Sequence, residues 1–562
     1  MPDRRLATIV GLATLGLLVL TEPKMAIVWD EGYTLGRVER VRLWFSALAD
    51  PPGFARTWTP PQIELVQQQG LRPPAPNQLA SRWNLLFDSR VIGWFWPFAR
   101  EEPHGHPPFY AWVALAGDVV TPWREPLARA RFGTMAMHAL AAAFVYLAIA
   151  RRFGTVAGLV SATCWATSPQ VFGLAHYATY DGLLNSLWIL GTLCAIEATG
   201  RTAEGRKSTW FWILTGIILG AAMSTKLSGY FLALPIAAAV AISGFRRADI
   251  RGLIVAGIVA VVAIYVINPS WWCEPIEGPI RFFRSNLTRG QTIAIETLYL
   301  GKVYVTPKES LPWSNALVLT AMTMPVLTLV AAALGAFSGL RNTPTRRFVA
   351  ILLISWAIPT GLRAMPHTPG HDGVRQFVAG LGVVTVLAGI AVSAIRSSRA
   401  NLAWVIAVPI MAESFVSMAL MMPVPLSYFS PAVGGLSGAA KLGMEPTYYW
   451  DGLTHETIDW LNRNTPPDRK IAFVGFPTSF LYLNRTGQLR PDVNPLTPGV
   501  YRWLVMQNRP GNWSEKDRAV IHDLKPAYVY EKSGVWLTAV YDMDEVLQTW
   551  KKAGASAAPI QP

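Results

Sequence analysis

The chain has 562 residues, of which 52% are apolar and only 15% charged, and its mean hydropathy is +0.29. Soluble domains carry about 25% charged residues, and a single soluble core stops growing near about 250–300 residues, so this composition excludes an ordinary soluble or disordered protein. The net charge of +14 does not indicate a nucleic-acid partner, because Lys and Arg are confined to short clusters between long apolar runs, as in membrane proteins.

Long apolar runs predict membrane spans along most of the chain. A helix needs about 20 apolar residues to cross the hydrocarbon, and a central charge is costly, so we place span boundaries at charges. The start resembles a signal peptide, but no small-residue cleavage site follows it, which favours a first anchor. The fold class predicted is therefore an α-helical polytopic membrane protein with about eleven transmembrane helices, at residues 6–28, 127–150, 155–175, 181–199, 209–225, 228–244, 251–268, 313–338, 346–363, 374–395 and 401–422.

The charges between these runs predict the topology. The apolar stretch 107–120 is short, aromatic and contains Asp118, which favours an interfacial helix over a span. Most Arg and Lys clusters then share one side, which the positive-inside rule makes cytoplasmic. Three large pieces are expected on the extracytoplasmic side: 29–126, 269–312 and 423–562. Few cysteines and no retention signal favour a multi-pass protein of a bacterial inner (plasma) membrane.

The C-terminal piece changes in composition. Residues 423–562 are richer in charge and proline than the preceding spans. The segments 471–476 and 526–531 have the pattern of short buried strands, whereas ETIDWLN and SEKDRAVIHDL are amphipathic at helical spacing. The chain therefore divides into a membrane domain, 1–422, and a small extracytoplasmic α/β domain, 423–562.

Acidic side chains occur where two predicted spans meet the outer surface. Asp30 and Glu31 follow the first span, and partial desolvation of adjacent carboxylates favours a general base or a cation ligand. Asp181 begins another span, close to His176 and Tyr180. The alternatives are a helix-capping pair for the first two and a simple helix boundary for Asp181.

Two cations are expected on the same side. Lys226 interrupts an apolar helical pair, and Arg375 begins a span where positive charge is otherwise scarce. A cation at such a place is expensive unless it meets an anion, and the phosphate of a lipid is a suitable one. Snorkelling of Lys226 to the interface is the alternative.

Histidines and tryptophans complete the candidate residues. His104 and His106 precede the interfacial helix as a pair able to ligate metal, with a structural turn as the alternative. His371 lies in the loop before Arg375. Trp271 and Trp272 are able to stack on a sugar, although aromatic belts look similar. No Walker, dinucleotide, HExxH or GxSxG motif occurs.

In their order, these motifs resemble the GT-C membrane glycosyltransferases, in the branch of protein O-mannosyltransferases and lipid A aminoarabinose transferases. The resemblance covers about residues 6–422 and rests on WDEGYTL (29–35), HPPFYAW (106–112), HYATYDGLL (176–184), TKLSGY (225–230) and HDGVRQF (371–377). One departure is His106, where the aminoarabinose transferases carry Lys, so donor recognition is expected to differ.

The resemblance implies a reaction and roles for residues. Sugar passes from a polyprenyl phosphate to an acceptor hydroxyl on the extracytoplasmic side, with inversion. Asp30 is then the base, Glu31 supports it, Asp181 is the second acid, and Lys226 and Arg375 bind the lipid phosphate. The remaining candidates are expected to bind substrate: His104, His106, His176, Tyr180, His371, Trp271 and Trp272. No cofactor is required by the sequence, and a divalent metal stays open, because several relatives work without one.

The sequence leaves two alternative functions to consider. A transporter or flippase would place charges near the bilayer midplane and show related halves, and neither is evident. An oligosaccharyltransferase or ligase with a diphosphate-linked donor would carry a WWD-type motif in the tail, which Tyr449, Trp450 and Asp451 only faintly echo. The tail is otherwise expected to carry little mechanistic information. The sugar and the acceptor are not identified by the sequence.

Overall fold

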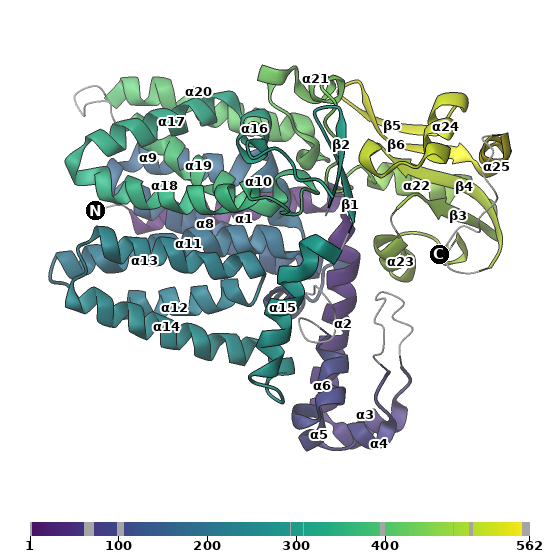
Figure 1. Cartoon of the computed structure of the whole chain (residues 1–562), viewed down its shortest axis with the longest axis horizontal. Helices are drawn as coiled ribbons and strands as arrows, with labels where there is room; N and C mark the ends of the chain where they lie inside the picture. The colour runs from purple at the N-terminus through teal and green to yellow at the C-terminus, as the bar shows by residue number, and fades with distance from the viewer. Residues whose placement is uncertain are drawn as a thin grey trace.

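The computed structural model describes residues 3–60, 72–97, 106–292, 294–306, 308–393, 400–475, 477–493 and 498–552. Long helices lie side by side in one part of the molecule, and a small sheet with short helices lies at one end of them (Figure 1). The N-terminus lies at the opposite end (Figure 1). The predicted fold class, a helical membrane protein with a small C-terminal α/β domain, is confirmed.

Seven helices among the described residues are long and apolar enough to cross a membrane. Each corresponds to a predicted span. They are α1 (Arg4–Thr21), α8 (Pro126–Phe153), α11 (Tyr180–Ala203), α14 (Arg247–Ile267), α18 (Thr343–Ala364), α19 (Val378–Val392, which continues η4, Gly373–Phe377) and α20 (Ala400–Met421). The first is shorter than expected at its C-terminal end, because a 3-10 turn, η1 (Glu22–Lys24), with Pro23 inside it follows Thr21.

Shorter apolar helices occupy the other four predicted spans. Two of these spans are interrupted, because Pro169 and Pro325 lack the N–H that a continuous helix needs. Residues 155–175 therefore form two helices, and residues 313–338 also form two. The elements are α9 (Thr155–Thr167), α10 (Pro169–His176), α12 (Thr209–Met223), η2 (Leu227–Leu232), α13 (Ala233–Ile242), α16 (Asn315–Thr323) and α17 (Val326–Arg341).

The first large loop is also helical. Its long helix α2 runs across the direction of α8 and α11 (Figure 1). The predicted short helix before α8 is present as α7, and Asp118 within it pairs with Arg42 of α2. The elements of this loop are α2 (Trp29–Ala49), α3 (Pro51–Thr57), α4 (Pro76–Leu79), α5 (Arg82–Phe87), α6 (Ser89–Phe95) and α7 (Phe109–Val120).

The second large loop carries a helix and a hairpin. It contains η3 (Pro269–Trp271), α15 (Glu277–Thr292) and the antiparallel strands β1 (Ile295–Tyr299) and β2 (Lys302–Thr306). The tip of the hairpin contacts the C-terminal region, since the amide of Gly301 donates to the carbonyl of Gly443 at 3.0 Å.

The C-terminal region forms a mixed four-stranded sheet in the order β3-β4-β6-β5. Strands β3 and β4 are parallel, and the other two pairs are antiparallel. Both predicted strands and both predicted helices are present, as β3, β5, α22 and α24. The elements are η6 (Pro425–Ser427), η7 (Pro431–Val433), α21 (Gly435–Lys441), α22 (His455–Asn464), β3 (Arg469–Phe473), α23 (Pro477–Arg485), η8 (Pro491–Val493), β4 (Val500–Gln507), η9 (Pro510–Asn512), α24 (Glu515–Asp523), β5 (Tyr528–Lys532), β6 (Val535–Asp542) and α25 (Met543–Lys552).

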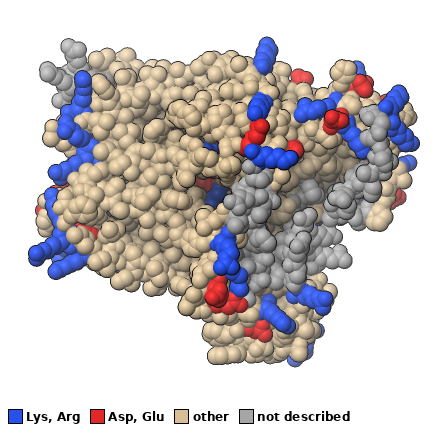
Figure 2. Space-filling model, in the orientation of Figure 1, with Lys and Arg blue, Asp and Glu red and all other residues tan. Residues whose placement is uncertain are grey.

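Charge is unevenly distributed on the visible face. The surface over the long helices is almost free of charged side chains, and Lys and Arg gather at the end where the N-terminus lies (Figures 1 and 2). Charged residues of both signs reappear around the C-terminal region (Figure 2). An uncharged band between two charged ends is the pattern of a membrane-spanning protein.

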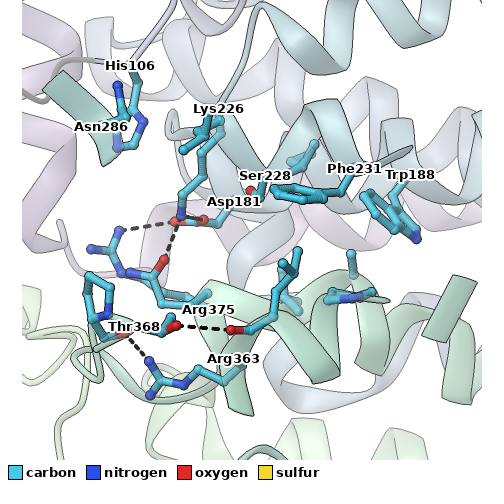
Figure 3. Close-up of a pocket in the computed structure, with 18 of the residues that line it drawn as sticks. His106, Asp181, Trp188, Lys226, Ser228, Phe231, Asn286, Arg363, Thr368 and Arg375 are labelled. Atoms are coloured by element: carbon cyan, nitrogen blue, oxygen red, sulfur yellow. Dashed lines mark hydrogen bonds and ion pairs between the residues drawn. The ribbon is translucent and has the colours of Figure 1, made fainter. Parts of the chain in front are cut away.

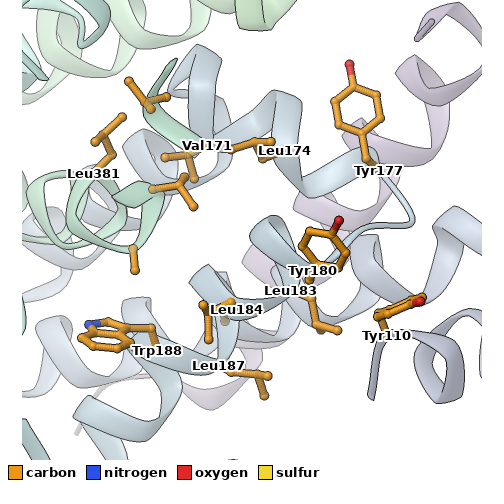
Figure 4. Close-up of a cluster of buried hydrophobic side chains, with 14 of the residues drawn as sticks. Tyr110, Val171, Leu174, Tyr177, Tyr180, Leu183, Leu184, Leu187, Trp188 and Leu381 are labelled. Atoms are coloured by element: carbon orange, nitrogen blue, oxygen red, sulfur yellow. The ribbon is translucent and has the colours of Figure 1, made fainter. Parts of the chain in front are cut away.

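Helix α11 lies at the centre of the membrane part. Its most apolar stretch is completely buried, unlike that of α14, which is only 17% buried. Leu183, Leu184, Leu187 and Trp188 of α11 pack in one large cluster with side chains of neighbouring helices (Figure 4). A central helix packed on all sides holds the residue at its N-terminus, Asp181, in a fixed place.

Candidate active site

Two carboxylates of the site lie in the first turns of helices. Asp30 is in the first turn of α2, and Asp181 is in the first turn of α11. The N-terminal end of a helix dipole stabilises negative charge there. Gly182 lets the turn approach α10 closely, since a Cβ at that position would lie 2.0 Å from the carbonyl oxygen of Leu174.

Two cations come from short connections between helices. Lys226 lies between α12 and η2, and Arg375 lies in the 3-10 turn η4. The turn before Arg375 uses left-handed backbone at Asp372 (φ 59°) and Gly373 (φ 61°). A side chain at Gly373 would contact the ring of Tyr448 at 2.9 Å, so the motif needs glycine at this position.

These four side chains form one ionic cluster, and each is less than a tenth exposed. Lys226 Nζ donates to Asp181 Oδ1 at 2.7 Å, and Arg375 donates to Asp181 Oδ2 at 3.1 Å. Arg375 also donates to Asp30 Oδ2. Figure 3 shows Lys226 and Arg375 both reaching Asp181. Residues separated by up to 345 positions thus share one network of charges.

Polar side chains surround Lys226. Its Nζ donates to Gln376 Oε1 at 2.9 Å and lies 5.7 Å from the ring centroid of Tyr180. The amide nitrogen of Gln376 lies 3.2 Å from His371 Nε2, and the ring of His106 packs on Tyr180 at 3.9 Å between centroids. His106, Tyr180 and His371 therefore lie close to the ionic cluster.

Three members of the cluster, Asp181, Lys226 and Arg375, line one end of a cavity of about 240 Å³, and Asp30 is paired with Arg375 beside it. Lys226, Asp181 and Arg375 are at its polar end, with Trp188 and Phe231 farther along it (Figure 3). The remaining wall is largely apolar and comes mainly from α11, η2, α18 and η4–α19; it includes Leu184, Pro359, Leu362, Val378 and Ala379. A cavity of this kind suits an amphipathic ligand with an anionic head.

Asp372 is a further anionic partner of Arg375. It pairs with Arg375 at 2.5 Å and with Arg509 of the C-terminal region at 2.8 Å. Burial raises the pKa of Asp372, but the two guanidinium groups outweigh burial and hold that pKa well below its ordinary value. Asp372 therefore stays ionised and keeps Arg375 in place.

Arg363 is a further cation in the cavity wall that sequence reasoning missed. It donates to the backbone carbonyls of Pro369 and Gly370 and, through Nε, to Asn315 at 2.9 Å. Its contacts hold the loop that carries His371. Arg363 lies near the end of an apolar helix, where a basic residue is usual at a span boundary. Its position in the sequence therefore gives no indication that it belongs to a site.

Glu31 does not face the cluster. It is completely buried and accepts hydrogen bonds from Arg131 at 2.7 and 2.9 Å and from the amide of Ala178 at 2.9 Å. Neighbouring positions on a helix point in different directions, so Asp30 and Glu31 diverge. The expectation that Glu31 supports Asp30 directly is corrected: it ties the start of α2 to α8.

Three other predicted substrate residues also lie away from the cavity wall. His176 is buried and contacts Thr21 Oγ1 at 2.9 Å and the carbonyl of Phe172 at 2.8 Å. Trp271 packs on Phe282, and Trp272 donates to the carbonyl of Tyr265. Their contacts are those of packing residues. His104 lies outside the described residues.

The C-terminal region supplies a residue, Tyr449, to which the sequence assigns no role in the site. The hydroxyl of Tyr449 donates to Asp30 Oδ2 at 2.9 Å and accepts from Arg375 at 3.2 Å. The tail was expected to carry little mechanistic information, but one of its side chains contacts both Asp30 and Arg375. The available signal was the aromatic and acidic sequence YYWDG at 448–452.

A metal site was left open by the sequence. Within the described ranges, no group of three or more His, Cys, Asp or Glu side chains is arranged to hold a metal ion. Asp30 and Asp181 instead share the guanidinium of Arg375.

Comparison with known proteins adds a family match and structural likenesses. No curated protein sequence matches the chain. The structure is similar to the crystal structure of ArnT from Cupriavidus metallidurans bound to undecaprenyl phosphate, with a TM-score of 0.48, 14% identity, and coverage of 95% of this chain and 97% of that one. It is also similar to the archaeal oligosaccharyltransferase AglB from Archaeoglobus fulgidus in complex with an inhibitory peptide and a dolichol-phosphate, with a TM-score of 0.45, 13% identity, and coverage of 88% of this chain and 69% of that one.

Residues 105–272 match the model of the family described as dolichyl-phosphate-mannose-protein mannosyltransferase. That match spans three of the five motifs and confirms the resemblance to membrane glycosyltransferases that they predict.

Proposed function

We propose that this protein is a membrane glycosyltransferase that moves a sugar from a polyprenyl phosphate to an acceptor hydroxyl with inversion. The observation that carries the proposal is the ionic cluster at the polar end of an apolar cavity: Asp181, Lys226 and Arg375 line that end, and Asp30 is paired with Arg375 beside it. Such a cavity accommodates an oily carrier and its phosphate together. The neighbours ArnT and AglB were solved with undecaprenyl phosphate and dolichol-phosphate respectively.

The donor phosphate is assigned to Lys226 and Arg375. Both cations are paired with carboxylates in the structure, so a donor phosphate would compete with Asp181 for them. The prenyl chain then lies along the apolar wall that includes Trp188, Phe231 and Val378. Positive charge at the leaving phosphate stabilises the anion that develops as the glycosidic bond breaks.

Asp30 is assigned as the base. In a direct displacement, the acceptor oxygen bonds to the anomeric carbon while the bond from that carbon to the phosphate oxygen breaks. The acceptor proton passes to Asp30, and the electron pair leaves with polyprenyl phosphate. No covalent enzyme intermediate is needed, and the two cations supply the positive charge without a cofactor.

The site is proposed to lie on the extracytoplasmic side of an inner (plasma) membrane. It is built at the N-terminal end of α11 and contacts Tyr449 of the C-terminal region. The basic residues gather at the other end of the long helices, where the N-terminus lies (Figures 1 and 2). Basic residues mark the cytoplasmic end of membrane proteins.

Sugar transfer by purified protein in lipid nanodiscs tests the proposal. Wild type is incubated with a panel of radiolabelled polyprenyl monophosphate sugars and extracts containing candidate acceptors, with and without EDTA. Asp30→Asn should retain expression and polyprenyl phosphate binding but lose transfer by at least about 100-fold. Asp459→Asn, an exposed acid of α22, is the matched control and should keep wild-type activity.

Three outcomes would contradict the assignment. Full transfer by Asp30→Asn would remove its role as base. Transfer from diphosphate-linked donors alone would favour the oligosaccharyltransferase alternative. Movement of labelled lipid across vesicles without attachment to an acceptor would favour a flippase.

A further inference from the structure

Tyr449 connects the C-terminal region to the ionic cluster. It lies between α20 and α22, and only 1% of it is exposed. Its hydroxyl bridges Asp30 and Arg375 at 2.9 and 3.2 Å. The guanidinium carbon of Arg375 also lies 4.4 Å from the centre of the Tyr449 ring. One side chain therefore touches both the proposed base and a proposed phosphate ligand.

The neighbouring residues hold Tyr449 in place. Trp450 stacks on Trp29, the residue before Asp30, with 5.2 Å between ring centroids. The hydroxyl of Ser479 donates to the carbonyls of Val28 and Trp29 at 2.9 and 3.2 Å. The C-terminal region is thus attached to the start of α2 at the residues that directly precede Asp30.

The two oxygens of the Asp30 carboxylate are in different environments. Oδ2 accepts hydrogen bonds from both Arg375 and Tyr449. Among the residues that the structure describes, none donates a hydrogen bond to Oδ1. An oxygen that already accepts two strong hydrogen bonds has little capacity left to take a proton, whereas the other oxygen keeps its lone pairs.

We propose that Tyr449 is a positioning residue of the reaction: it holds Asp30 Oδ2, so that Oδ1 is the atom that takes the acceptor proton. This role rests on the proposed function. The acceptor proton moves to Oδ1, the acceptor oxygen bonds to the anomeric carbon, and the phosphate leaves with the electron pair. Tyr449 exchanges no proton in this step and keeps its own.

The environment of Tyr449 agrees with a neutral donor. Burial raises the pKa of its hydroxyl well above the ordinary value, and the nearby acids raise it further, against the opposing effect of Arg375. The hydroxyl therefore stays protonated throughout the range in which such enzymes are assayed. A protonated hydroxyl between a guanidinium and a carboxylate fixes the orientation of both groups.

Tyr449→Phe tests the proposal, with Tyr448→Phe as the matched control. The first substitution removes the hydroxyl and keeps the ring over Arg375. Tyr448 is also buried, and its hydroxyl donates to Met444 Sδ at 3.9 Å rather than to a member of the ionic cluster. We expect kcat to fall about 10-fold in Tyr449→Phe, with polyprenyl phosphate affinity within twofold of wild type. Tyr448→Phe should change neither.

The pH profile separates positioning from packing. A hydrogen bond donated to a carboxylate favours its charged form, so loss of the hydroxyl should move the acid limb of the kcat profile to higher pH. A more acidic phenol at the same place, 3-fluorotyrosine at position 449, should move that limb to lower pH. A residue that only packs would change the height of the profile and leave the position of the limb unchanged.

The outcomes are distinguishable. Wild type that transfers no sugar from any polyprenyl phosphate donor overturns the proposed function and this role with it. Active wild type with Tyr449→Phe equal to Tyr448→Phe overturns the positioning role alone. The same conclusion follows if Tyr449→Phe loses lipid binding in parallel with kcat, or if neither variant at 449 moves the acid limb.

Discussion

Lys226 offers a direct measure of how strongly the cluster binds a lipid phosphate. The residue is 8% exposed, and its ammonium group donates hydrogen bonds to Asp181 at 2.7 Å and to Gln376 at 2.9 Å. In Lys226→Met the phosphate loses a charge-assisted hydrogen bond, which contributes about 1.5–3 kcal/mol. Because Lys226 must leave Asp181 to meet the phosphate, the net loss is expected at the low end of that range, or about 10- to 30-fold in Kd.

The measurement is equilibrium binding of radiolabelled undecaprenyl phosphate to purified protein in nanodiscs. Lys302→Met is the matched control, since Lys302 is an exposed cation on β2 paired with Glu309 at 2.8 Å. Asp181→Asn provides the opposite perturbation: it removes the competing carboxylate and should tighten lipid binding while it lowers transfer. Unchanged affinity in Lys226→Met, or weaker binding in Asp181→Asn, would refute the competition between carboxylate and phosphate.

Two further predictions concern buried acids outside the cavity. Glu31→Gln should lower the free energy of unfolding by about 1.5–3 kcal/mol, because Arg131 loses one of its two buried carboxylate partners and keeps only Glu22 at 3.2 Å. Thermal unfolding checks this, and a stable variant with reduced kcat would instead support a catalytic role. Burial raises the pKa of Glu445 to about 7. Arg509 opposes this rise only in part, because it also pairs with Asp372. The folded state then binds the proton more tightly than the unfolded state, whose pKa stays near 4.5, so this group's contribution to stability is lost as pH rises from about 4.5 to 7. Glu445→Gln should flatten the pH dependence of the melting temperature in this interval, and an unchanged slope would contradict the assignment.

Much of the membrane architecture follows from local sequence. Hydropathy and charge position locate the helices, because the cost of placing a charge in hydrocarbon depends on composition rather than on tertiary contacts. The same reasoning places α7 and the elements of the C-terminal region. It misses the interruptions before Pro169 and Pro325, because hydropathy measures side-chain polarity and does not register the loss of one backbone N–H.

The site shows where sequence reasoning stops. Residue chemistry and motif order select Asp30, Asp181, Lys226 and Arg375, since each is an ionisable group at the edge of an apolar run. Only the folded chain separates Asp30 from its neighbour Glu31, because helix geometry directs one to Arg375 and the other to Arg131. Only the folded chain brings Tyr449 to Asp30 across 419 positions, because side-chain contacts at that separation depend on how whole elements pack.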